Sequence, residues 1–330
     1  MIRFNTFCKE IADGSELLFL ESNIPVQLKN FEIDGIISDS PQAITFLIRN
    51  SALNMKCIMR VLRKWVCTNS KRQSTTYKDI FSKFKNRSSD FVQIFCVYEN
   101  PAFLVIVSEH SPLGNIFNYL YGGKKGSANT LTEQAVALLA VKMLGCIKQA
   151  HEEKGILFAI KPEEVFIRST SEVVLSHLTT AKLSLKEVAS KSFLEVTEYL
   201  PPEALEKKAV GSAVDLWQLG VFLYECLFGV TPFQQGSDLD TKNVIQKSNV
   251  YFPPDSIKKV SEECKEFIRV LLEKNPDKRT ENSFQKLEDH PFISNSSKIE
   301  GAAVIFDLAL INQEELLEIK TKLTDTVSLT

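Results

Sequence analysis

Side chains that could bind a metal or form disulfide bonds are spread singly through this sequence of 330 residues. The seven cysteines include no C-x-x-C pair, and their odd number argues against a disulfide framework or a zinc cluster and favours a reducing compartment. His177 could ligate zinc, but no cysteine or second histidine lies near it in the sequence. This isolation favours a histidine that packs in a core or lines a cleft. No metal site is therefore expected.

The charge of the chain is nearly balanced, with 39 Lys and Arg residues, 41 Asp and Glu residues and a net charge of −2. No overall basic field is present, so no nucleic-acid partner is expected. One basic stretch, 64–87, contains a single acid, Asp79. It is a candidate for contact with an acidic partner or an anionic membrane surface, although its composition favours a solvated loop. No apolar run suits a transmembrane segment, and a cytoplasmic location is predicted.

Short hydrophobic runs in the first half of the chain predict an antiparallel sheet. Residues 44–50 and 56–62 are apolar or β-branched and are separated by a hairpin-like spacing. The segment 91–109 repeats this pattern on either side of Pro101. These runs together predict about five antiparallel strands.

After Pro112 the hydrophobic pattern becomes helical. Thr130 and Glu133 have the spacing of a capping box at the start of one helix. The segment 214–229 is apolar nearly all round, which places it inside a helical lobe, and 261–276 has a single apolar face that we expect to end at Pro276. The sequence therefore predicts an α+β fold, with a small sheet lobe and a larger helical lobe that meet at a ligand cleft.

Seven segments, in order along the chain, resemble the eukaryotic protein kinase family. They are CIMRVLRKW, IVSEHSPLGNIFNYL, HEEKGILFAIKPEEVFI, VVLSHLTTAKL, EYLPPEAL, VDLWQLGVFLYECLFGVTPF and FIRVLLEKNPDKRT. The resemblance is to the AGC group in particular, and it suggests the ribosomal S6 kinase-like proteins as relatives. It implies a bilobal protein kinase-like fold.

The resemblance also implies the domain boundaries. The kinase-like domain would cover 31–293, after an N-terminal extension, 1–30, and before a C-terminal tail, 294–330, with a short helix. Within the domain we expect the N-lobe over about 31–107, a hinge at 108–111 and the C-lobe over 112–293.

Four positions that perform phosphoryl transfer in the family hold other residues here. Ala159 replaces the aspartate that accepts the substrate proton, and His177 replaces the aspartate that holds Mg²⁺. Glu164 replaces the metal-binding asparagine, Arg60 replaces the lysine that pairs with the ATP phosphates, and Lys161 is retained. Alanine cannot accept a proton, and neutral imidazole is a poor ligand for Mg²⁺. We therefore expect no catalytic residue and no bound Mg²⁺.

The nucleotide-binding positions also differ from the family pattern. The three glycines of the phosphate loop correspond to Ser38, Ser40 and Ala43, whose Cβ atoms hinder a close approach of the backbone to phosphate. The remaining counterparts of the adenine pocket and hinge are Ile58, Ser108, Glu109, His110 and Phe166. Ile58 and Phe166 are larger than the family's residues above and below adenine, so they would fill that space. We expect no cofactor, and retained ATP binding is the alternative.

The positions that hold the family's fold together are kept. The resemblance implies a buried ion pair between Glu203 and Arg279, and a contact of Asp215 with the catalytic-loop backbone. The prediction is therefore a pseudokinase that serves as a scaffold or allosteric partner of other proteins, with an active kinase as one candidate. Two alternatives stay open, a weakly active or atypical serine/threonine kinase that uses ATP and a nucleotide-binding sensor without turnover.

Overall fold

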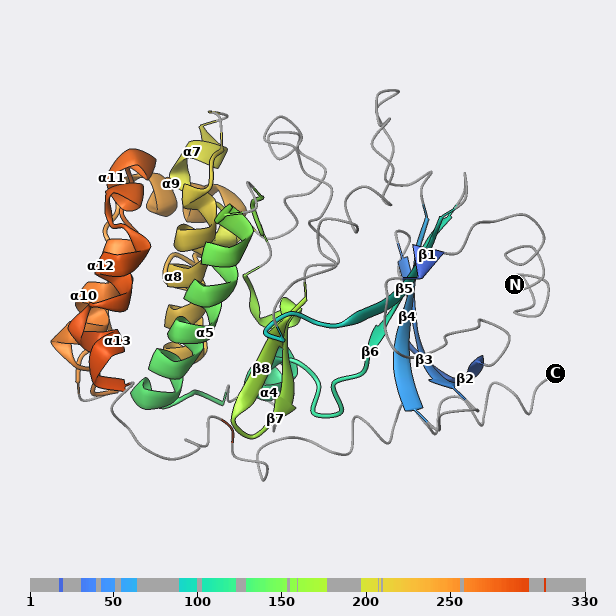
Figure 1. Ribbon diagram of the computed structural model, residues 1–330. Helices are drawn as coiled ribbons and strands as arrows, with labels where there is room; N and C mark the ends of the chain where they lie inside the picture. Colours follow the sequence, from blue (N-terminus) through green and yellow to red (C-terminus); the bar gives the residue numbers. More distant parts are fainter. Residues whose placement is uncertain are drawn as a thin grey trace. The chain divides into compact units, whose positions relative to one another are not determined.

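The computed structural model describes residues 18–19, 31–39, 43–50, 55–63, 89–99, 103–122, 129–152, 155–158, 160–176, 197–206, 208, 210–255, 258–296 and 306. These residues form two compact units that divide between Ser111 and Pro112. The first unit is a sheet and the second is mainly helical (Figure 1). The predicted α+β fold is confirmed by this composition.

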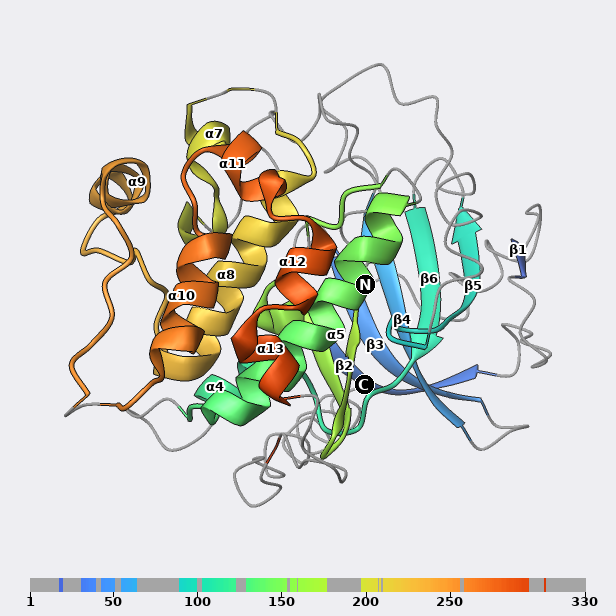
Figure 2. The same ribbon diagram turned by 60° about the vertical axis from the view of Figure 1, so that its left-hand side comes forward.

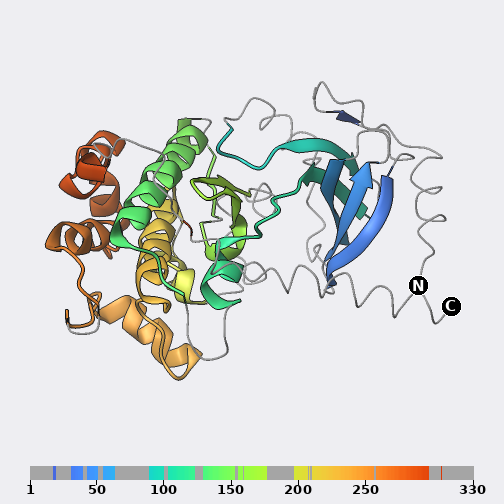
Figure 3. The same cartoon turned by 90° about the horizontal axis from the view of Figure 1, so that it is seen from below.

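The sheet unit contains six antiparallel strands in the order β1-β5-β6-β4-β3-β2. The strands are β1 (Leu18–Phe19), β2 (Phe31–Asp39), β3 (Ala43–Asn50), β4 (Met55–Arg63), β5 (Ile94–Glu99) and β6 (Phe103–Glu109). Figure 3 shows them side by side, coloured blue to teal. Sequence patterns predicted about five strands, and the sixth, β1, has only two residues, too short to show alternation.

Alternation along β4 gives the sheet its two faces. Cys57, Met59 and Val61 are buried in the core of the unit, whereas Ile58 and Arg60 point to the other face and are partly buried. The β3–β4 register is regular from Ala43 opposite Leu62 to Asn50 opposite Met55. The edge strand β2 is less regular, with register shifts after Ile33 and after Ile36.

The helical unit is built around α8. Its helices are α4 (Ile116–Tyr121), α5 (Glu133–Glu152), α7 (Pro202–Leu205), α8 (Ala213–Phe228), α9 (Asp238–Lys247), α10 (Glu262–Leu271), α11 (Pro276–Glu281), α12 (Phe284–Glu288) and α13 (Pro291–Ser296). Helix α8 packs against both α5 and α10 (Figure 2), and its residues from Ala213 to Leu227 are all buried. The prediction of a helix inside the lobe is therefore confirmed. None of the helices in the described part of the chain is long and apolar enough to cross a membrane.

Four short elements lie next to the helices of this unit. They are the hairpin of β7 (Val165–Ser169) and β8 (Glu172–Leu175), and the single 3₁₀ turns η2 (Pro162–Glu164) and η3 (Thr197–Tyr199). Helix α4 contacts η2 and β7, while α8 contacts η3. The N-cap residue of α4, Asn115, also donates a side-chain hydrogen bond to the carbonyl of Glu163 at 3.1 Å. Through these contacts, residues of α4, η2, η3 and α8 come close together although they are far apart in the sequence.

Two predicted helix ends are wrong. The side chain of Thr132, not of Thr130, accepts a hydrogen bond from the N–H of Ala135 at the start of α5, and the Thr130 hydroxyl contacts Lys258 Nζ instead, at 2.9 Å. Helix α10 ends at Leu271, whereas Pro276 is the first residue of α11, where its missing N–H is not needed. The predicted helix in the tail 294–330 and most of the predicted N-terminal extension lie outside the described residues.

Candidate functional site

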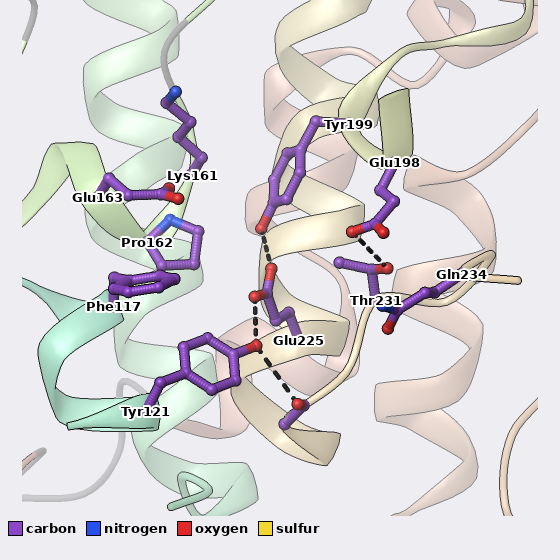
Figure 4. Close-up of a pocket in the computed structure, with 11 residues that line it drawn as sticks. Phe117, Tyr121, Lys161, Pro162, Glu163, Glu198, Tyr199, Glu225, Thr231 and Gln234 are labelled. Carbon is purple, nitrogen blue, oxygen red and sulfur yellow. Dashed lines mark hydrogen bonds between the residues drawn. The ribbon is translucent and has the colours of Figure 1, made fainter. Parts of the chain in front are cut away.

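A pocket of about 290 Å³ opens in the helical unit (Figure 4). Helix α4 supplies Phe117 and Tyr121, and η3 supplies Tyr199 and Glu198. The other lining residues are Lys161, Pro162, Glu163, Glu225, Gly229, Thr231 and Gln234. Three of the eleven lining residues are glutamates and one is a lysine, so the pocket carries a negative charge.

Glu225 forms the inner wall of the pocket with 6% of its surface exposed. Its two carboxylate oxygens each accept a hydrogen bond from a phenol, Oε1 from Tyr121 and Oε2 from Tyr199. Burial raises the pKa of Glu225, the two tyrosine hydrogen bonds oppose this change, and the nearby Glu163 and Glu198 add to it. Burial and the contact with Glu225 also raise the pKa of both tyrosines. The phenols therefore remain neutral donors to this carboxylate.

The other two glutamates of the pocket, Glu163 and Glu198, are partly buried, whereas Glu225 is buried. Glu198 accepts a hydrogen bond from the hydroxyl of the buried Thr231 at 3.1 Å. Glu163 follows Lys161 by two residues on the opposite wall. The three carboxylates thus come from η2, η3 and α8, which the fold brings together from distant parts of the sequence.

A second buried carboxylate, Asp215, holds the segment that precedes η2. It accepts hydrogen bonds from the N–H of Leu157 at 3.0 Å and of Phe158 at 2.7 Å, and it contacts His151 Nε2 at 2.8 Å. Phe158 has a φ of 50°, a conformation that costs a non-glycine residue free energy. The hydrogen bonds of Asp215 stabilise this strained backbone.

A buried ion pair joins α7 to α11. Arg279, 1% exposed, donates to Glu203 from Nη1 at 2.9 Å and from Nη2 at 3.3 Å. Three backbone carbonyls also accept N–H groups of the guanidinium, those of Ala213, Glu273 and Lys274. This arrangement satisfies the five donors of the arginine and leaves neither charge without a partner.

The predicted nucleotide-binding positions of the sheet unit lie on several strands. Ser38 is exposed on β2 opposite Thr45, and Ala43 is buried at the start of β3. Ser40 lies outside the described residues. Ser38 thus takes part in a strand ladder at the position where a loop would need to wrap around phosphate.

Ile58, Arg60 and Ser108 lie on the same region of the sheet. Ile58 is directly opposite Ser108 of β6, and Arg60 is opposite Ile106. The Nε atom of Arg60 is buried and has no hydrogen-bond partner among the described residues.

The two predicted hinge residues, Glu109 and His110, have different surroundings. Glu109 accepts a hydrogen bond from the N–H of Gln93 at 2.8 Å. Burial and the nearby Lys56 lower the pKa of His110, which favours a neutral imidazole.

The predicted catalytic and adenine-pocket positions of the helical unit are also found in different surroundings. Lys161 lines the pocket, while Glu164 is buried with 7% of its surface exposed. Phe166 is partly buried on β7 and forms an isolated bridge with Asn115. Ala159 and His177 lie outside the described residues. Among the described residues, no three of the types His, Cys, Asp and Glu gather as ligands for a metal.

Sequence reasoning missed the two tyrosines and all three glutamates of the pocket, and of its lining residues it named Lys161 alone as a site candidate. Glu225 lies in a segment that was interpreted as apolar nearly all round, although a carboxylate within such a helix is itself a signal of a buried polar contact. Its partners, Tyr121 and Tyr199, are 104 and 26 residues away in the sequence. No local pattern reveals contacts across such distances.

The sequence is similar to known protein kinases. The protein kinase domain model matches residues 43–293. Aurora kinase B of Danio rerio is 24% identical over 282 residues, which cover 84% of each chain. The Probable myosin light chain kinase of Dictyostelium discoideum is 25% identical over 290 residues, 86% of this chain and 58% of that protein. Flippase kinase 1 of Saccharomyces cerevisiae is 24% identical over 296 residues, 82% of this chain and 32% of that protein.

We expect Arg279→Ala to lower the free energy of unfolding of the helical unit by about 3–5 kcal/mol, because Glu203 would be left charged and buried. Chemical denaturation monitored by tryptophan fluorescence measures this change, since Trp217 lies 5.0 Å from the guanidinium. The control is Lys242→Ala, which removes an exposed ion pair with Asp238 and should cost less than about 1 kcal/mol. Equal effects of the two substitutions would contradict the buried ion pair.

The raised pKa of Glu225 predicts a pH-dependent effect of Glu225→Gln. The folded state binds the proton of this carboxyl more tightly than the unfolded state, so its contribution to stability is greatest at low pH and declines as the pH rises through the folded pKa. The melting temperature of wild type minus that of the variant should therefore decrease from pH 5 to pH 8. Glu262→Gln is the control, because Lys265 lowers the pKa of Glu262 and the trend should be weak and reversed. An unchanged difference across this range would disprove the assignment.

Proposed function

The chain belongs to the protein kinase family, and from this premise we propose that it is a catalytically impaired member that acts by binding another protein. The residue types at the positions of the transfer chemistry support impairment, since Ala159, His177 and Arg60 differ from the family pattern. Loss of a positioned general base alone reduces a rate by about 10²–10⁴. Such a protein would act in signalling as a scaffold or allosteric partner.

Mg²⁺ and ATP, which the family implies, are poorly matched by the residue types at their positions, since Arg60, Glu164 and His177 stand where the family has a lysine, an asparagine and an aspartate. Glu164 is the one counterpart of a metal ligand that is described, and no third acid, histidine or cysteine completes a ligand group around it among those residues. Ile58 lies on β4 opposite Leu47 of β3 and Ser108 of β6, and its side chain is larger than the family's residue above adenine, which argues against a bound adenine. We therefore derive no step of a reaction through a bound nucleotide.

The observation that carries the binding function is the convergence of Glu163, Glu198 and Glu225 on one pocket. Three carboxylates with a single lysine attract a cationic side chain, and a guanidinium could donate to two of them at once. A partner that offers arginine or lysine in an extended segment has the chemistry that fits.

Exposed apolar side chains beside the pocket could bind a further, apolar residue of the partner. Phe117 is 42% exposed, and Val230, next to the lining residues Gly229 and Thr231, is 50% exposed. Exposed apolar groups beside a charged pocket are typical of protein-binding surfaces. We infer that the partner segment places an apolar residue next to its cation.

A second candidate function is nucleotide binding without turnover. Arg60 favours it, because the buried Nε atom lacks a hydrogen-bond partner within the described part of the chain and a phosphate oxygen could supply one. Against it stand the bulk of Ile58 and the strand conformation of Ser38.

The two candidates are separated by thermal shift with ATP, in the presence and absence of Mg²⁺. We expect no shift in either condition, and no transfer of radiolabelled phosphate from ATP to the protein or to a generic substrate. A shift independent of Mg²⁺ that Arg60→Ala abolishes would support the nucleotide sensor. Phosphate transfer that Lys161→Ala abolishes would overturn the proposal of impaired catalysis.

The pocket is tested with a pair of fluorescent heptapeptides that carry a central arginine, or its neutral isostere citrulline, between leucines. We expect the arginine peptide to bind more tightly to the wild-type protein. The double variant Glu163→Gln/Glu198→Gln should weaken its binding by about 10-fold to 100-fold, the effect of losing charge-assisted hydrogen bonds. Glu262→Gln on α10, outside the pocket lining, is the matched control and should bind like wild type. Equal binding of the two peptides to wild type would refute the charged pocket.

A further inference from the structure

The two phenols that contact Glu225 have different surroundings. Tyr199 is 5% exposed in η3, and within the described residues its hydroxyl contacts Glu225 alone. Tyr121 is 37% exposed at the end of α4, where its ring packs against Phe117 with 4.9 Å between the centroids. Tyr199 is thus a buried donor on one side of Glu225, and the more exposed Tyr121 is the donor on the other side (Figure 4).

The Tyr121 hydroxyl has one proton and two acceptors within reach. Besides Glu225 Oε1, the carbonyl oxygen of Gly229 lies 3.3 Å from the phenol oxygen. Gly229 is the C-cap of α8 with a φ of 71°, and its N–H donates to the backbone carbonyl of Glu225. This turn fixes the Gly229 carbonyl beside the carboxylate. A rotation about the phenol C–O bond can therefore move the hydrogen bond from one acceptor to the other without moving the ring.

We propose that Tyr121 is a gate that competes with the partner's cation for Glu225 Oε1. In the empty pocket the phenol donates to Oε1. When a guanidinium or ammonium group enters, the phenol donates to the Gly229 carbonyl and leaves Oε1 to the stronger, charge-assisted hydrogen bond. This inference rests on the proposed function of the pocket and adds to it a specificity-determining residue.

Tyr121 competes for Glu225 Oε1, but its hydrogen bond also lowers the pKa of Glu225 and so keeps this carboxylate charged for a cation. The groups that face Glu225 are Tyr121 from α4, Tyr199 and Glu198 from η3, Glu163 from η2 and, on the pocket wall, Lys161. The two phenols lower the pKa of Glu225, whereas burial and the two glutamates raise it. Removal of the Tyr121 hydroxyl should therefore free Oε1 and also make the empty-pocket carboxyl easier to protonate. The two effects separate in a pH profile, because only the second disappears at high pH.

The variant Tyr121→Phe tests the gate, since it keeps the ring contact with Phe117 and removes the hydroxyl alone. The dissociation constants of the arginine and citrulline heptapeptides are measured from pH 5 to pH 9 on the full chain. At pH 8 we expect the variant to bind the arginine peptide about 3-fold to 10-fold more tightly than wild type, the effect of one competing hydrogen bond. The pH midpoint of binding should also move upward. Tyr199→Phe is the comparison and should give no gain in affinity, because the buried Tyr199 donates to Oε2, so its removal does not free Oε1.

The outcomes distinguish the gate from the pocket. If wild type prefers arginine to citrulline but Tyr121→Phe binds as wild type or more weakly at every pH, with an unchanged midpoint, the gate is wrong and the proposed function stands. If neither protein distinguishes the two peptides while both melt cooperatively, the proposed function is wrong and the gate falls with it.

Discussion

Arg279 carries a full positive charge inside the helical unit, and its hydrogen bonds tie together three separate segments of the chain. The guanidinium reaches Glu203 in α7, the carbonyl at the start of α8 and the two carbonyls that follow α10. Because a buried charge without its partner costs several kcal/mol, these segments can separate only together. Helix α7 directly follows η3 in the chain, so the wall of the pocket that η3 supplies depends on this ion pair.

Three of the four buried acids among the described residues of the helical unit, Glu203, Asp215 and Glu225, are satisfied in different ways. Glu203 faces a charged arginine, and Asp215 accepts two backbone N–H groups and contacts His151. Glu225 has two neutral phenols as its described hydrogen-bond donors, and neither brings a positive charge. Its negative charge is therefore the least compensated of the three, and it lies at the pocket rather than in the anchor of the fold. This difference in compensation supports the proposal that a partner's cation binds at Glu225 and not at Glu203 or Asp215.

Local patterns in the sequence predicted the regular elements well. The strands expected at 44–50 and 56–62 were found as Ala43–Asn50 and Met55–Arg63, because alternation of side chains is a property of neighbouring residues. Helix starts were harder to predict, since Thr130 and Thr132 both suit a cap and the choice depends on Lys258, 128 residues further along. The pocket was not predicted at all. Its walls come from segments that the sequence separates, and the residue that unites them, Glu225, is a polar exception in an apolar helix.

The edge of the sheet unit has a consequence for self-association. Strand β2 ends the sheet on one side and exposes Ile36 and Ile37, a pair that would favour pairing with a second molecule. Its two register shifts interrupt the regular row of N–H and C=O groups that such pairing needs, and Glu32 and Asp39 add exposed negative charge. At the opposite edge, the described part of β1 pairs two residues with β5. The irregular edge of β2 disfavours the growth of intermolecular β-structure from that side of the sheet, and with it amyloid-like stacking.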